Sequence, residues 1–378
     1  MAMFGTSWRV GRVAGIEVRI DSSWALIALL ITYSMYLRLS VLYRELDGGG
    51  AVGLAVVSAV LFFGSVLVHE LAHALAAQAR GIRVQDITLF LFGGATRAKI
   101  DARGPGDEFL IALVGPLTSG LLAGLFGLVA GLGHNLLSVP LAGTLGYLAW
   151  TNLLLAGFNL VPGFPLDGGR LLRSAIWKTT GSLARATRIA SAAGQAVGWL
   201  LVAAGVAWLL AGDLAGGIWF AFIGWFLVQA ARASSHDLQL QQLLAGVEAE
   251  DVMAADLVRI APQLSLQDAV DNYFMRYDHS GFPVEEGGRT IGLLTLRALR
   301  RVPKEQWPTH RVRDHMVPLD DQVVVAPKAR MDGVVGKLQD GQANRVLVVE
   351  DGEVVGIITP TDLTRWLHRW QTLQGTTH

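Results

Sequence analysis

The stretch that decides the fold runs from Gly53 to Ala79 and reads GLAVVSAVLFFGSVLVHELAHALAAQA. It is almost wholly apolar, and a helix needs about 20 such residues to cross a bilayer core of about 30 Å. Ionisable groups at membrane depth are costly, so by default they indicate function. The pentapeptide HELAH at 69–73 therefore predicts a functional site inside a membrane-spanning helix.

The spacing within this pentapeptide is typical of a metal site. Residues four apart lie on one helix face, so His69 and His73 can direct two ring nitrogens at one ion. In an HExxH pattern the glutamate, here Glu70, activates the metal-bound water and shuttles its proton. The alternatives are chance and a structural pair of histidines beside a buried carboxylate. The apolar surroundings argue against both, because ionisable groups without a function are costly to place in lipid.

A catalytic zinc takes three protein ligands, and the chain has no cysteine, so the third must be His, Asp or Glu. The best candidate is Asp167, within NLVPGFPLDGGR at 159–170. Two prolines break the helix there, and Gly168 and Gly169 permit close backbone approach. We expect Asp167 to project from an unwound segment at membrane depth, which is tolerated only where it faces protein or water. An ordinary loop carboxylate is the alternative.

Composition predicts a membrane protein with a soluble part. The chain is 52% hydrophobic and 16% charged, and its net charge of zero suggests no nucleic-acid partner. Six apolar runs are long enough to span a bilayer, at about 23–41, 53–79, 108–132, 141–161, 189–211 and 214–231.

Two short segments between or before these runs predict strands. Residues 16–21 alternate in polarity, and residues 84–94 are typical of a strand with a tight turn. The exposed edge of the second segment could bind an unwound substrate as an added strand. A surface hairpin without a catalytic part is the alternative.

Lysine and arginine placement predicts the orientation. The connections after the second and fourth runs hold five such residues each, whereas those after the third and fifth hold none. Positive charge collects on the cytoplasmic side, so both termini should be cytoplasmic in a multi-pass plasma-membrane protein. Only Arg38 and Arg44 oppose this pattern.

HELAH, NLVPGFPLDGG and Gly115-Pro116 with Ser119 resemble the site-2 proteases, a family of intramembrane zinc metalloproteases. The resemblance covers residues 1–232, which we take as the transmembrane domain. It implies zinc ligands at His69, His73 and Asp167, a catalytic Glu70, and contacts to substrate or oxyanion from Asn159, Ser119, Gly93 and Gly94. The family often has asparagine where this chain has Ser119, and small-residue helix packing is an alternative role for that serine.

The polar tail contains a repeat of about 64 residues. After an expected linker helix at 233–250, Gly292-Leu293-Leu294-Thr295 recurs as Gly356-Ile357-Ile358-Thr359. Each unit, at 251–303 and 309–370, predicts a strand, a helix, paired strands around a glycine turn, and a helix.

These units resemble paired cystathionine-β-synthase (CBS) domains. The resemblance implies regulation by ATP or another adenine nucleotide, with Thr359 and Asp362 as the ribose-binding Thr-x-x-Asp element. The first repeat has Ala298 at the matching position, so at most one standard ribose contact remains. A helix cap by Thr359 explains the same residues. CBS pairs often dimerise, so we also expect a homodimer.

The sequence thus predicts a polytopic α-helical membrane protein with about six transmembrane helices and a small β-sheet or hairpin at the cytoplasmic membrane face. A soluble α/β CBS-pair domain follows. The predicted activity is zinc-dependent hydrolysis of peptide bonds in transmembrane segments of membrane-bound substrates. A CBS-regulated transporter or channel is the main alternative, since intramembrane charges can line an ion path. An inactive scaffold is a third.

Overall fold

The structure is a computed structural model. It describes residues 7–82, 84–90, 93–98, 104–133, 136–244, 246–277, 279–319, 324–340 and 345–373. The chain separates into two compact units, Met1–Leu238 and Gln239–His378.

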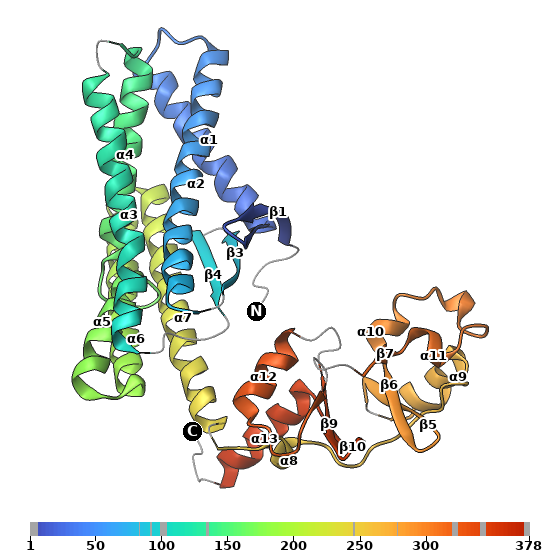
Figure 1. Cartoon of the computed structure of the whole chain (residues 1–378). Helices are drawn as coiled ribbons and strands as arrows, with labels where there is room; N and C mark the ends of the chain where they lie inside the picture. The colour runs from blue at the N-terminus through green and yellow to red at the C-terminus, as the bar shows by residue number, and fades with distance from the viewer. Residues whose placement is uncertain are drawn as a thin grey trace. The chain divides into compact units, whose positions relative to one another are not determined.

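Six long helices form the first unit and confirm the prediction of a polytopic membrane protein (Figure 1). All six are long and apolar enough to cross a membrane, α7 through its part up to Ser234. Their bounds are α1 (Ser22–Leu42), α2 (Gly48–Ala79), α3 (Pro105–Leu132), α4 (Val139–Asn159), α6 (Leu183–Leu210) and α7 (Leu214–Leu244).

Several helices extend past the predicted runs because polar caps, and not hydropathy, decide where they begin. The side chain of Asp47 accepts a hydrogen bond from the Gly50 N–H, so α2 starts five residues before the expected run. The hydroxyl of Ser182 likewise accepts from the Arg185 N–H at the start of α6. Such caps satisfy backbone donors that the first helical turn leaves unpaired.

A seventh helix of this unit, α5 (Asp167–Thr180), corrects one expectation. We expected Asp167 in an unwound segment, but the non-helical residues are 160–166 and the helix restarts at Asp167 itself. The Phe164–Pro165 peptide bond lies within that break, and Leu166 is the extended N-cap. The helix is short and amphipathic, so hydropathy alone gave no signal for it.

A four-stranded sheet packs beside one end of α2 (Figure 1). It has the order β1 (Ser7–Val13), β2 (Ile16–Asp21), β3 (Val84–Phe90), β4 (Gly93–Ala98). The strand predicted at 16–21 is confirmed as β2, and 84–94 supplies β3 and the start of β4; residues 91 and 92 lie outside the described residues. β1 was not predicted. Buried Ile16 and Ile87 join Ala74 of α2 and Ile111 of α3 in one core.

The second unit contains the two predicted repeats. The first is built from α9 (Leu266–Ala269), β5 (Gly281–Glu286), β6 (Arg289–Thr295), α10 (Leu296–Leu299), α11 (Val312–His315) and β7 (Val317–Pro318). The second is built from β8 (Val324–Val325), α12 (Met331–Asp340), β9 (Val346–Glu350), β10 (Glu353–Ile358) and α13 (Pro360–Leu373).

Both predicted hairpin turns are present in these repeats. Gly287 and Gly288 have positive φ of 60° and 81°, and Asp351 and Gly352 have 51° and 84°. Two consecutive positive φ values are the requirement of a tight turn whose twist matches the flanking strands.

The expected linker helix at 233–250 is not a separate helix. α7 continues to Leu244, whose side chain is buried in the core of the second repeat with Val346 and Ile358. A new short helix, α8 (Ala249–Val252), then begins and buries Ala249 and Val252 in the same core. The exact domain boundaries stay predictions.

Candidate metal centre

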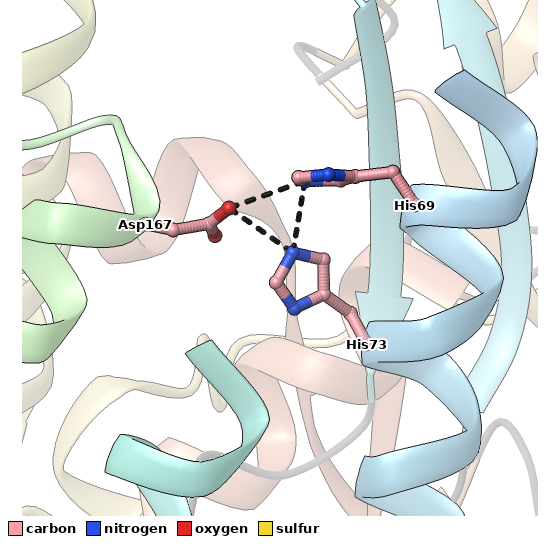
Figure 2. A group of neighbouring side chains, drawn as sticks. All are labelled: His69, His73 and Asp167. Carbon is pink, nitrogen blue, oxygen red and sulfur yellow. Dashed lines mark hydrogen bonds and ion pairs between the residues drawn. The ribbon is translucent and has the colours of Figure 1, made fainter. Parts of the chain in front are cut away.

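Three predicted ligands converge on one point (Figure 2). The Nε2 atoms of His69 and His73 lie 3.2 Å apart, and Asp167 Oδ2 lies 3.2 Å and 3.1 Å from them. Tetrahedral zinc with bonds of 2.0–2.1 Å places its ligand atoms about 3.3 Å apart. The donor set and its spacing therefore fit a zinc ion. Both histidines are buried, with 4% and 6% of their surface exposed.

The far side of each imidazole is held by α3. His73 Nδ1 lies 2.6 Å from the carbonyl oxygen of Ile111, and His69 Nδ1 lies 2.8 Å from Ser119 Oγ. A carbonyl only accepts, so Nδ1 of His73 carries the proton and its Nε2 lone pair is free for a metal. Such outer partners fix the ring orientation of metal ligands.

α3 also leaves room for an ion. Gly115 faces the two imidazoles, and a Cβ at this position would overlap the Nε2 atoms of both His73 and His69. Any side chain at Gly115 would thus fill the space in which the ligand atoms converge.

Asp167 is held by close backbone packing, as the two glycines after it predicted. A Cβ at Gly168 would overlap the carbonyl oxygens of Leu160 and Val161, and a Cβ at Gly169 would overlap the backbone at Gly163. Asp167 is the first residue of α5, where the helix dipole favours a negative charge. This packing joins the ligand rigidly to the end of α4.

Glu70 lies directly against β4. A Cβ at Gly94 would overlap Cγ of the Glu70 side chain and lie 2.7 Å from its Cδ. β4 is also one of the two edge strands of the sheet in the described part of the chain. The catalytic carboxylate expected from the sequence therefore packs against an edge strand. Gly93 begins this strand and pairs with Phe90.

Two of the predicted substrate contacts lie in different surroundings. Ser119 is completely buried and its Oγ lies 2.8 Å from His69 Nδ1, so it is placed to orient a ligand, and its predicted contact to substrate stays a prediction. Asn159 is half-buried at the end of α4, and its predicted role stays a prediction. Ile111 was missed, because a backbone carbonyl has no sequence signal.

Substituting Ser119 with Ala should weaken zinc binding about 10- to 100-fold, since it removes the partner of His69 Nδ1. Thr118→Ala is the matched control, because the Thr118 hydroxyl donates to Val114 O of its own helix. Competition with a zinc chelator measures both affinities. Equal affinity in the two variants would contradict the orienting role.

Two family models match the chain: peptidase family M50 at 57–140 and 133–202, and the CBS domain at 249–305 and 312–369. Rip3 of Mycobacterium tuberculosis, named as a zinc metalloprotease, is 37% identical over 97% of this chain and 94% of its own length. The Synechocystis zinc metalloprotease sll0528 is 34% identical over 95% of each chain. The solved site-2 protease of Methanocaldococcus jannaschii is 26% identical and covers 61% of this chain and 95% of its own, with a TM-score of 0.44. By its match to the M50 family model and its 37% identity to Rip3, the chain belongs to peptidase family M50 and carries a pair of CBS domains.

Proposed function

We propose that this chain is an intramembrane zinc endopeptidase that hydrolyses peptide bonds within or near transmembrane segments of membrane-bound proteins. The observation that carries the proposal is the convergence of Asp167, at the start of α5, with His69 and His73 on α2, a helix long and apolar enough to cross a membrane. Glu70 follows His69 on the same helix. When bound, zinc lowers the pKa of a water molecule and polarises the scissile carbonyl. Glu70 takes the proton of the attacking water and returns it to the leaving amine.

The substrate is proposed to bind as an added strand along β4. A helical peptide hides its carbonyl groups in its own hydrogen bonds, so a transmembrane substrate must unwind before attack. Edge strands offer free backbone groups that hold an extended peptide. Gly94 has no side chain between β4 and Glu70, which supports a role for Gly93 and Gly94 in bringing substrate backbone to the carboxylate. We assign Asn159 to the same substrate or its oxyanion.

The CBS pair and both termini are proposed to face the cytoplasm of a cell-membrane protein. The uneven lysine and arginine distribution supports this orientation. His73 then lies six residues before the cytoplasmic end of α2 at Ala79, about 9 Å along the helix axis. Water would reach the centre from the cytoplasm.

Single cysteines test the orientation cleanly, because the chain has none of its own. In intact cells a membrane-impermeant maleimide should label Ser138→Cys, at the exposed start of α4, and not Thr179→Cys, at the exposed end of α5. Permeabilisation should make both react. The reverse pattern in intact cells would contradict the proposed orientation.

Glu70→Gln should keep zinc and lose cleavage by about 10²- to 10⁴-fold, because general acid–base catalysis contributes that factor. Purified full-length protein with a model transmembrane substrate measures the rate, and metal analysis measures zinc content. Glu17→Gln, at an ion-paired glutamate of β2, is the control. Equal cleavage by Glu70→Gln and wild type would refute the role of Glu70.

The same assay separates the alternatives. A transporter or channel would carry ions without needing Glu70, and family membership does not favour it. An inactive scaffold would cleave no substrate. A homodimer through the CBS pair stays a prediction.

Regulation by an adenine nucleotide at the CBS pair is the second part of the proposal. Thr359 and Asp362 are its expected ribose contacts, and they already bond to each other. Thr359 donates its N–H and its hydroxyl to Asp362 Oδ2, at 3.0 Å and 2.6 Å. This is the N-terminal cap of α13. A ribose would therefore share or replace these cap contacts.

The first repeat offers a matched control for nucleotide binding, since Ser265 and Asp268 form the same kind of cap before α9. Asp362→Ala should weaken ATP binding about 10- to 100-fold in calorimetry, as expected for lost hydrogen bonds to a charged group. Asp268→Ala should lose a cap and keep ATP affinity. No binding of ATP by wild type, or no effect of ATP on cleavage, would contradict nucleotide regulation.

A further inference from the structure

Two adjacent carboxylates in the first turn of α3 contact the two helices that carry the zinc ligands. Asp107 accepts a hydrogen bond from Arg80 Nη1 at 2.5 Å, at the C-terminal end of α2. Glu108 accepts from Arg173 Nε at 2.5 Å, on α5. α2 carries His69 and His73, and α5 begins with Asp167, so α3 connects both halves of the ligand set.

The two ion pairs differ in burial. Glu108 has no exposed surface, and the side chain of Arg173 is 16% exposed. Both Nε and Nη2 of Arg173 contact Oε1 of Glu108, whereas Oε2 has no hydrogen-bond partner among the described residues. The Arg80–Asp107 pair is more open, with side chains 41% and 24% exposed. Removing one partner from a buried pair leaves an uncompensated charge, whereas exposed pairs contribute little.

Arg173 also fixes the segment that leads into Asp167. Its guanidinium lies over the ring of Phe164 at 5.0 Å from the centroid, a cation–π contact. Phe164 is buried three residues before Asp167, and its N–H donates to the Ala190 carbonyl on α6 at 3.1 Å. Arg173 thus connects its own helix, α5, to the loop before Asp167 through Phe164 and to α3 through Glu108.

One buried face of α3 contacts all three ligands or the residues that hold them. Glu108, Ile111, Gly115 and Ser119 follow one another at intervals of three, four and four, which places them along one side of a helix. Ile111 and Ser119 hold the two histidines and Gly115 leaves the space between the ligand atoms. Glu108 is the member of this face that reaches the third ligand, through Arg173.

We propose that Glu108 and Arg173 are positioning residues for the metal centre: their buried ion pair sets the place of Asp167 relative to the two histidines. Glu108 touches neither the ligand atoms nor substrate in this role, and acts through Arg173 and α5. The inference rests on the proposed zinc centre, and its test therefore measures metal affinity and not only cleavage.

The test compares two neighbouring carboxylates that undergo the same chemical change. In purified full-length protein, Glu108→Gln should weaken zinc binding about 10- to 100-fold, as other supporting partners of metal ligands do. Asp107→Asn should change it less than about twofold, because its pair is exposed. The visible spectrum of the cobalt-substituted protein reports ligand geometry, and should change in Glu108→Gln and not in Asp107→Asn.

A second variant separates positioning from folding. Glu108→Gln alone leaves the largely buried charge of Arg173 without a carboxylate partner. Glu108→Gln/Arg173→Met removes both charges and should fold like wild type by circular dichroism and gel filtration. It should still bind zinc about 10- to 100-fold more weakly. Wild-type affinity and cobalt spectrum in the folded double variant would overturn the positioning role alone. Wild-type protein that binds neither metal would overturn the zinc centre and the positioning role together.

Discussion

The membrane unit depends on one constraint: two imidazoles and one carboxylate must lie 3.1–3.2 Å apart within an apolar helix bundle. In surroundings of low dielectric constant, a buried polar atom without a hydrogen bond destabilises the fold. A hydrogen-bonded one is held in a fixed position. Each imidazole here has a partner on its far side, and the backbone that carries the carboxylate is closely packed. Ser119 holds His69, the Ile111 carbonyl holds His73, and tight backbone packing after Asp167 holds the carboxylate. α3, which supplies no ligand, supplies most of this support.

The sequence pointed to the three candidate ligands more readily than to their supports. His69 and His73 lie one helical turn apart, and Asp167 was the best candidate for a third ligand and the one that the family resemblance implied. The supports are long-range or have no side-chain signal: Ile111 acts through its backbone, and Glu108 meets Arg173 across 65 residues. The starts of α5 and α6 were missed because they are polar or amphipathic, and hydropathy detects only apolar runs. β1 was missed for a related reason, since its residues are mostly exposed and are bound mainly by pairing with β2.

The second unit shows how one short motif can have two physical meanings. The repeats predicted both hairpins around glycine turns, and the structure shows these turns with the positive φ that such hairpins need. The Thr-x-x-Asp element is less informative. A hydroxyl and a carboxylate three residues apart suit a ribose, and they suit the first turn of a helix equally well. Ser265 and Asp268 satisfy the same geometry at α9. Spacing of this kind therefore has little power to identify a ligand site.

The ligands come from distant parts of the chain, with His69 and Asp167 separated by 98 positions. An ion bound by all three would act as a cross-link that closes a loop containing α3 and α4. Cross-links across long loops restrict the unfolded chain, and metal binding to a native site adds its free energy to folding. The ion would thus stabilise the packing of α2 against α5 in addition to its catalytic role. Chelation would loosen the helix bundle in addition to stopping the chemistry.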